Sequence, residues 1–258
     1  MKPLLAFLGL LTFASPVGAQ SDTRLFEMRV YYAAEGKLEA LHKRFRDHTL
    51  GLFAKHGMTS LGYFTPTGPN PERKLVYFLA YPDRSARDAS WKAFLNDADW
   101  KAAKAESERQ GTLVARIENT FLVATDFSPR AQPGNFGQGI FELRTYTAAE
   151  GRLSALQARF REHTLGLFRK HGMTNISYWT MAEDQKDGKT TFVKGSTLIY
   201  LLAHGSEAAA KKSFEAFRAD PDWIAAKAAS EQKAGGSLTI PDGVRSEFLV
   251  PTDYSPLK

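Results

Sequence analysis

Residues Phe26–Phe64, FEMRVYYAAEGKLEALHKRFRDHTLGLFAKHGMTSLGYF, occur a second time as Phe141–Trp179, FELRTYTAAEGRLSALQARFREHTLGLFRKHGMTNISYW. The two stretches are identical at 26 of 39 positions, at a constant offset of 115. The match continues more loosely, with LVYFLAY at Leu75–Tyr81 corresponding to LIYLLAH at Leu198–His204 and FLVATDFSP corresponding to FLVPTDYSP. Each copy spans roughly a hundred residues, which is a normal domain size. The chain is therefore a tandem duplication of one folding unit.

The hydrophobic period within each copy changes from two to about three and a half and back to two, which predicts strands separated by helices. Their order is strand, helix, strand, strand, helix, strand, the ferredoxin-like pattern. In the first copy we expect a first strand at 26–31, a helix at 35–56 ended by Gly57, a hairpin of strands at 58–65 and 74–81, helices at 86–96 and after the N-cap Asp97, and a last strand at 119–125.

A ferredoxin-like sheet carries helices on one face, so its other face needs a cover, and the second copy supplies one. The expected fold is α+β, with two ferredoxin-like (βαββαβ) repeats packed sheet to sheet as an intramolecular α/β barrel. We expect repeat 1 at residues 20–129, a linker rich in Gly, Pro and Gln at 130–139, and repeat 2 at 140–258. The connection 180–196 is longer than its counterpart and polar, which predicts a surface loop.

Residues 1–19 have the pattern of a secretory signal peptide: Lys2, an apolar run at Leu4–Ala14, and small residues up to Ala19. Cleavage is expected near Ala19–Gln20, which predicts a secreted or periplasmic protein; the alternative is an uncleaved N-terminal anchor. No later stretch has the roughly twenty apolar residues of a transmembrane helix.

The composition excludes several classes of site. The chain contains no cysteine, so it has no disulfide, thiolate nucleophile or thiolate metal site. Its formal charge is +6, but basic and acidic residues alternate along the predicted helices, without the basic patch typical of nucleic-acid-binding proteins. It also lacks a P-loop, a dinucleotide fingerprint and a zinc helix. We expect no nucleic-acid partner and no metal.

The motifs ELRTYTAAEGRL, FRKHGM, ISYW and FRADPDW in the second copy resemble the NIPSNAP family, as do FEMRVY, FAKHGM, LGYF and NDADW in the first. The resemblance covers nearly the whole chain twice and suggests a bacterial-type exported member. It implies the dimeric α/β barrel superfamily, here with both halves of the barrel on one polypeptide. Related barrels include cofactor-free monooxygenases and haem-degrading enzymes, so the resemblance does not select a reaction.

The first strand carries candidate site residues, because Glu27, Arg29 and Tyr31 share one face. If Phe26 and Met28 face the helices, this polar face points into the barrel. One interpretation is an internal salt-bridge network that fixes how the sheets meet. The other is an arginine that binds a carboxylate, phosphate or enolate. The equivalent candidates in the second copy are Glu142, Arg144 and Tyr146.

The histidines form a second candidate set. His48 and His163 lie on the apolar stripe of the predicted long helix, so we expect them to be at least partly buried, as general bases, haem ligands or structural donors. His56 and His171 precede a capping glycine and are interpreted as structural. Aromatic candidates for the lining of a cavity, or for plain barrel packing, are Tyr63, Tyr77, Tyr178, Trp179 and Tyr200.

Three functions fit these residues. The first is a small-molecule binder or cofactor-independent enzyme that uses the barrel interior for an anionic or aromatic molecule. The second is a non-catalytic protein-interaction module, which requires an exposed apolar patch. The third and weakest is haem binding through His48 or His163. Further homo-oligomerisation, the substrate and the repeat that holds the working site are left open by the sequence.

Overall fold

The computed structural model describes residues 22–137, 139–183, 185–187, 190–192 and 195–258. The predicted signal peptide at 1–19 lies outside these residues. Repeat 1 consists of β1 (Leu25–Ala33), α1 (Leu38–Arg44), the π turn η1 (Phe45–Thr49), α2 (Leu50–Lys55), β2 (Thr59–Pro66), β3 (Lys74–Tyr81), α3 (Arg84–Asn96), α4 (Ala98–Ser107) and β4 (Val114–Ala124).

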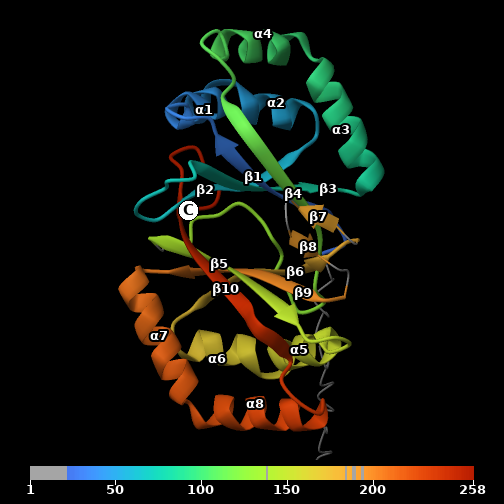
Figure 1. Ribbon diagram of the computed structural model, residues 1–258, viewed down its shortest axis with the longest axis vertical. Coiled ribbons are helices and arrows are strands. Elements are labelled where there is room, and N and C mark those ends of the chain that lie inside the picture. Colours follow the sequence, from blue (N-terminus) through green and yellow to red (C-terminus); the bar gives the residue numbers. More distant parts are fainter. Residues whose placement is uncertain (1–21, 138, 184, 188–189, 193–194) are drawn as a thin grey trace, which may run out of the picture.

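Repeat 2 has the same order of elements with one insertion (Figure 1). Its elements are β5 (Ile140–Ala148), α5 (Leu153–Arg159), η2 (Phe160–Thr164), α6 (Leu165–Lys170), β6 (Thr174–Met181), β7 (Gln185–Asp187), β8 (Thr190–Phe192), β9 (Thr197–His204), α7 (Glu207–Ala219), α8 (Pro221–Lys233) and β10 (Thr239–Pro251). The inserted strands β7 and β8 pair with each other where the polar composition predicted a loop.

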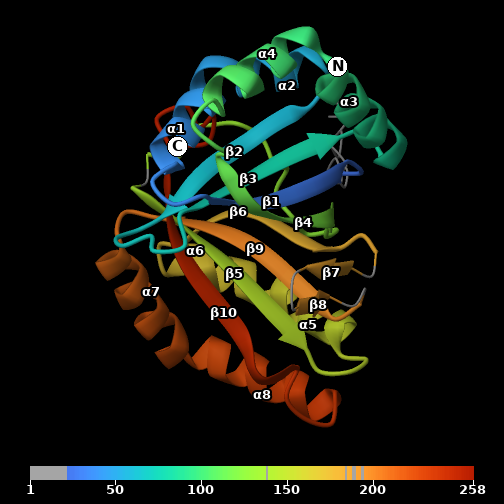
Figure 2. The same ribbon diagram turned by 45° about the horizontal axis from the view of Figure 1, so that its top comes forward.

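The two sheets close into one eight-stranded barrel, as predicted. Repeat 1 has the strand order β4-β1-β3-β2 and repeat 2 the order β10-β5-β9-β6. The seams β2–β10 and β4–β6 join the sheets, with antiparallel pairs such as Val250↔Thr65 and Val123↔Thr180. The helices of the two repeats cover opposite sides of the barrel (Figures 1 and 2).

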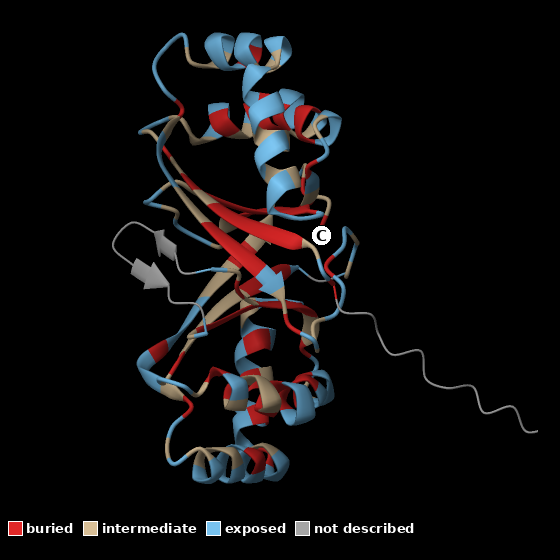
Figure 3. Cartoon of the chain, turned by 90° about the vertical axis from the view of Figure 1, so that its right-hand side faces the viewer, coloured by how far each residue is buried: buried red, intermediate tan, exposed pale blue. Residues whose placement is uncertain are grey.

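The barrel interior is apolar and filled by side chains of both repeats. Figure 3 shows that much of the barrel strands is buried. Phe78 from β3 stacks on Trp179 from β6, with ring centroids 5.3 Å apart and planes at 14°. Phe26 and Phe141, at equivalent places in the first strands, are both fully buried in this core. A cavity lined by Phe64, Phe78, Trp179 and their neighbours measures only about 10 Å³. The prediction of a ligand pocket in the barrel interior was therefore wrong.

The polar face of β1 points the other way, beneath the helices of its own repeat. Tyr31 belongs to the core between sheet and helices, whereas Phe26 and Met28 belong to the barrel core. The prediction that Glu27, Arg29 and Tyr31 share one face of β1 is confirmed, but the prediction that this face points into the barrel is wrong. Both faces of β1 are covered. The polar partners that offset the desolvation of Glu27 and Arg29 lie on the helix side of the sheet, on α3 and on β3.

The predicted long helix is continuous over α1, η1 and α2, but η1 changes its phase. The hydroxyl of the buried Thr49 donates to the carbonyl of Arg44 at 3.1 Å inside this turn. A π turn holds more residues than an α turn, so the side chains after it are displaced around the axis. His48 is exposed for this reason, and Thr49 occupies the buried position.

The predicted caps are present. Gly57 and Gly172 both have φ of +75°, the left-handed conformation that ends a helix. Asp97 and Asp220 cap α4 and α8 by accepting from backbone N–H groups. None of the helices in the described ranges combines the length and apolarity needed to span a bilayer.

The predicted linker, 130–139, contacts the C-terminal tail through residues 134 and 136. Ala131 is buried in the barrel core, and the amide of Gly134 donates to the carbonyl of Pro256 at 3.0 Å. A parallel bridge joins Gly134 to Leu257. This segment thus packs against both the barrel core and the C-terminal tail.

Candidate functional site

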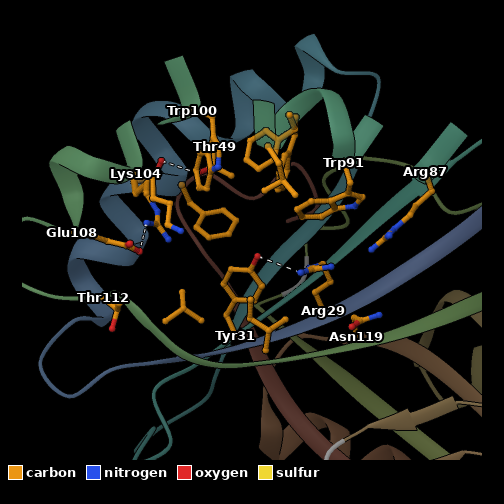
Figure 4. Close-up of a pocket in the computed structure, with 17 residues that line it drawn as sticks. Arg29, Tyr31, Thr49, Arg87, Trp91, Trp100, Lys104, Glu108, Thr112 and Asn119 are labelled. Atoms are coloured by element: carbon orange, nitrogen blue, oxygen red, sulfur yellow. Dashed lines mark hydrogen bonds and ion pairs between the residues drawn. The ribbon is translucent and has the colours of Figure 1, made fainter. Parts of the chain in front are cut away.

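Repeat 1 contains a cavity of about 520 Å³ between its sheet and its helices, which we call pocket 1 (Figure 4). Arg29 and Tyr31 reach it from β1, and Asn119, which pairs with Arg29 across the strands, reaches it from β4. The helices contribute mainly aromatic and cationic side chains: Arg44, Phe45, Phe53, Arg87, Trp91, Phe94, Trp100 and Lys104. The volume lies within the usual range of small-molecule sites.

Glu27 holds the floor of pocket 1 in place. Its carboxylate is fully buried and accepts from Arg29 Nη1 at 2.5 Å, and from Arg87 Nε and Nη2 at 2.9 and 2.8 Å. The Tyr81 hydroxyl and the Trp91 indole N–H donate to it at 3.2 and 3.3 Å. One buried anion thus orients the floor arginine and joins β1 to α3.

Both charges of this cluster persist despite burial. Burial by itself raises the pKa of Glu27, but the hydrogen bonds and positive charges of Arg87 and Arg29 hold that pKa below its usual value. Burial lowers the pKa of Arg29, but the neighbouring Tyr77, Tyr31 and Glu27 raise it above its usual value overall. The Arg29–Glu27 pair is consequently an ion pair and not a neutral hydrogen bond.

A second arginine, Arg44 of α1, faces pocket 1 from the helix layer. Its side chain is 4% exposed and donates from Nη1 to Glu108 at 2.9 Å. Its guanidinium carbon lies 5.2 Å from the ring centre of Trp100. Its Nε is buried and has no hydrogen-bond partner among the described residues. Figure 4 places Glu108 and Lys104 across the pocket from Arg29 and Arg87.

Repeat 2 contains the equivalent pocket 2, with a volume of about 680 Å³. Arg144 donates from Nε to Tyr200 at 2.9 Å and from Nη2 to Tyr146 at 3.3 Å. Arg159 takes the place of Arg44, and its Nε is likewise buried without a partner in the described chain.

The carboxylate beneath pocket 2 has different partners. Glu142 is paired with Arg144 and accepts from Ser246 at 2.5 Å, and its Oε2 lies 3.0 Å from Nε2 of the buried His204. Alignment of Phe94 with Phe217 puts Ala210 where repeat 1 has Arg87. Burial raises the pKa of Glu142, while His204 and Arg144 lower it more, to below its usual value. In both repeats a buried carboxylate thus holds the floor arginine. Glu27 binds two arginines, whereas Glu142 binds one.

The histidine candidates do not belong to either pocket. His48 and His163 are exposed, contrary to the expected burial, and neither lines pocket 1 or 2. Neither histidine is therefore placed to bind a haem inside pocket 1 or pocket 2. His56 and His171 instead hydrogen-bond the capping carboxylates Asp97 and Asp220, each at 2.7 Å.

The aromatic candidates lie behind the pockets. Tyr63, Tyr77, Tyr178 and Tyr200 are fully buried under the helices, and Tyr77 accepts from Arg29 Nε at 2.9 Å. Trp179 lies in the barrel core instead. Tyr77 and Tyr200 thus hold the floor arginines in position without lining the pockets.

Several pocket residues were missed by the sequence reasoning, above all Arg44, Arg87 and Glu108. Arg44 has a recognisable signal, since it is repeated as Arg159 next to a buried phenylalanine in the duplicated stretch. Arg87 has none, because the second copy has alanine there. Among the described residues, no group of three or more His, Asp or Glu side chains is arranged to hold a metal ion.

The NIPSNAP family model matches residues 26–129 and 141–256. A search of curated proteins finds no significant match. An uncharacterised NIPSNAP domain protein from Burkholderia xenovorans is similar at 27% identity, over 41% of this chain and 99% of its own, with a TM-score of 0.36.

Two solved structures match over both repeats. A candidate monooxygenase from Lactobacillus acidophilus has 9% identity over 89% of this chain and 94% of its own, with a TM-score of 0.53. An anthrone oxidase-like protein has 12% identity, coverage of 92% and 95%, and a TM-score of 0.52. At these identities the likeness concerns the fold, a two-repeat α/β barrel. Because the two family matches together cover most of the chain, the protein belongs to the NIPSNAP family.

Proposed function

We propose that each repeat binds a small anionic molecule with an apolar or aromatic body in the pocket between its sheet and its helices. The observation that carries the proposal is the floor arginine. Hydrogen bonds to Glu27, Tyr77 and Tyr31 use three of the five N–H donors of Arg29, so two remain for a ligand. Arg144 has the same three kinds of partner.

The pocket walls favour an apolar ligand body. Phe45, Phe53 and Trp91 surround the space above Arg29. Of the six large hydrophobic side chains that are exposed in the described chain, four line the two pockets: Leu95, Ile117, Ile224 and Val244. Exposed apolar groups therefore gather at the pockets, which supports a binder over a protein-interaction module.

The binding test uses the tryptophans that line the pockets. Titration with 2-naphthoate, followed by tryptophan fluorescence and calorimetry, is expected to show two sites per chain. A charged hydrogen bond contributes about 1.5–3 kcal/mol, so Arg29→Lys with Arg144→Lys should weaken binding about ten- to a hundredfold. The exposed Arg46→Lys serves as a matched control. Equal affinity in all three proteins would refute the proposal.

A cofactor-independent oxidation is the second candidate, because an arginine beside a tyrosine suits an enolate and the two full-length neighbours are described as oxygenase- or oxidase-like. With anthrone as substrate, the ring CH2 would become a carbonyl. One atom of O2 would become the carbonyl oxygen, and the other would leave as water with the two hydrogens of the CH2 group. Oxygen uptake should then depend on Arg29 and Arg144. Uptake no faster than without protein would remove this candidate.

We also propose that the protein is exported, because Lys2, the apolar run Leu4–Ala14 and the small residues up to Ala19 form the pattern of a signal peptide. Expression of the full chain in a Gram-negative host should yield a periplasmic form that begins at Gln20. N-terminal sequencing and intact mass measure this directly. A cytoplasmic protein that retains Met1 would contradict export without affecting the pockets.

A further inference from the structure

We infer that Arg44 and Arg159 form a second anion subsite in each pocket, so that the ligand is a dicarboxylate whose acidic groups are held from two sides. This inference rests on the proposed function and narrows its ligand class. Its starting point is a pair of buried polar atoms that the protein itself leaves unpaired, Nε of Arg44 and Nε of Arg159.

These two arginines are buried as deeply as core residues. Their side chains are 4% and 5% exposed, and each has one carboxylate partner, Glu108 at 2.9 Å and Glu231 at 3.5 Å. Burial lowers the pKa of Arg159 more than Glu231 raises it. A buried N–H group without a partner costs about 1–3 kcal/mol, so its repetition in both repeats requires an explanation.

The charge balance points to two anionic groups. Among the side chains that line pocket 1, the four cations Arg29, Arg44, Arg87 and Lys104 face the single carboxylate Glu108. Glu27 behind the floor lowers the excess to two, and the exposed Asp88 beside Arg87 is largely screened by solvent.

Pocket 2 repeats this balance. Arg144, Arg159, Arg218 and Lys227 face Glu231, with Glu142 behind the floor. The excess of about two positive charges therefore survives the substitutions that distinguish the repeats.

Geometry places the two arginines on different layers. Arg29 comes from the sheet and Arg44 from the helix before η1, while Phe45 and Tyr31 also line the pocket. The ring centroids of these two aromatic residues lie 5.9 Å apart at 76°. Two planar guanidinium groups with aromatic rings beside them match a flat molecule with a carboxylate at each end, since each carboxylate accepts two parallel N–H bonds.

The test compares matched acids that differ only in the second carboxylate: benzoate with terephthalate, 2-naphthoate with naphthalene-2,6-dicarboxylate, and biphenyl-4-carboxylate with biphenyl-4,4′-dicarboxylate. In calorimetry with the full chain, at least one diacid should bind about ten times more tightly than its monoacid. Arg44→Gln should reduce the number of tight diacid sites from two to one, and Arg44→Gln with Arg159→Gln to none, while monoacid binding persists.

Glu108→Gln is a second variant that does not remove the arginine. Releasing Arg44 from its partner should strengthen diacid binding by a larger factor than it strengthens monoacid binding, which a structural role for Glu108 would not produce. If monoacids bind and no diacid of the three pairs binds better, the subsite does not exist although the proposed function holds. If neither class binds, the proposed function itself fails.

Discussion

Glu27 illustrates the residue scale, because one fully buried carboxylate meets two arginines, a tyrosine and a tryptophan. Glu27→Gln keeps the shape but leaves the buried Arg29 without its anion and Arg87 with only the exposed Asp88. Breaking a buried ion pair at one partner costs about 3–5 kcal/mol, so the free energy of unfolding in urea should fall by that amount.

Glu142→Gln is the matched control for that experiment. The carboxylate of Glu142 pairs with one arginine, so Glu142→Gln leaves one arginine without that anion. It should lower the free energy of unfolding by less than Glu27→Gln does. Equal unfolding free energies for the wild type and Glu27→Gln would show that the pair contributes nothing to stability.

The pH dependence follows from the same two carboxylates. The pKa of Glu27 and the pKa of Glu142 lie below their usual value in the folded protein. Their contribution to stability is therefore complete above the unfolded pKa of about 4.3 and is lost as the pH falls through the folded pKa.

Urea unfolding at stepped pH values checks this dependence. The wild type should lose stability steeply below about pH 4.3, and the double variant Glu27→Gln/Glu142→Gln should lose it less steeply. Parallel curves for the two proteins would contradict the assignment.

Residue-scale prediction from sequence succeeded where the pattern is local. The alternation of Glu27, Arg29 and Tyr31 identified a polar face, and two of these residues do line a pocket. The layer that this face meets is decided by distant partners, in particular Arg87 on α3. No spacing within β1 encodes that choice, because both faces of the strand are buried.

At the scale of elements, η1 and η2 set the phase of the long helices. Thr49→Val removes the hydroxyl that donates to the Arg44 carbonyl while preserving volume. The Arg44 carbonyl keeps its backbone hydrogen bond in the π turn and loses only the one from the hydroxyl. A typical hydrogen bond contributes about 0.5–1.5 kcal/mol net, so the thermal and urea stability should fall by about that amount.

Thr49→Ser, which keeps the hydroxyl, is the control for this change. It should retain most of the hydrogen-bond contribution, and any residual loss reflects the missing methyl group. A Ser variant as unstable as the Val variant would assign the effect to packing instead.

Helix ends could be predicted from nearby residues, but the π turn inside the long helix could not. The caps at Gly57, Asp97 and Asp220 were predicted because each acts on backbone groups a few residues away. The π turn was not, since a regular period of 3.6 was assumed across Phe45–Thr49. His48 was consequently misplaced to the buried side of the helix.

At the scale of the whole molecule, the two repeats share one core. Phe78 of repeat 1 stacks on Trp179 of repeat 2, and Phe64 contacts Phe141 with ring centroids 5.1 Å apart. Neither sheet can expose its inner face without losing this packing. We expect a single unfolding transition whose calorimetric and van't Hoff enthalpies agree.

Because both halves belong to one chain, the midpoint of this transition should not change over about a hundredfold range of protein concentration. Differential scanning calorimetry across dilutions measures it. Two separate transitions, or a midpoint that rises with concentration, would contradict a barrel closed within one chain.

The closed barrel was predictable because a duplicated unit and a sheet with one bare face leave few other arrangements. The location of the pockets was not predictable from the sequence. It depends on whether side chains fill the barrel interior or the space between sheet and helices. Large side chains such as Trp179 fill the barrel, whereas the space under the helices is left open and lined by arginines. The packing of side-chain volumes in three dimensions decides where the cavities lie, and a pattern of residues along the sequence does not contain this information.

Because both repeats belong to one chain, a substitution in one pocket does not have to occur in the other. In a barrel assembled from identical subunits, every substitution is imposed on both cavities at once. Here Arg87 and Ala210 already differ at matching positions, as do Tyr81 and His204. Natural variation is thus able to specialise one cavity for a new molecule while its sibling keeps the ancestral one.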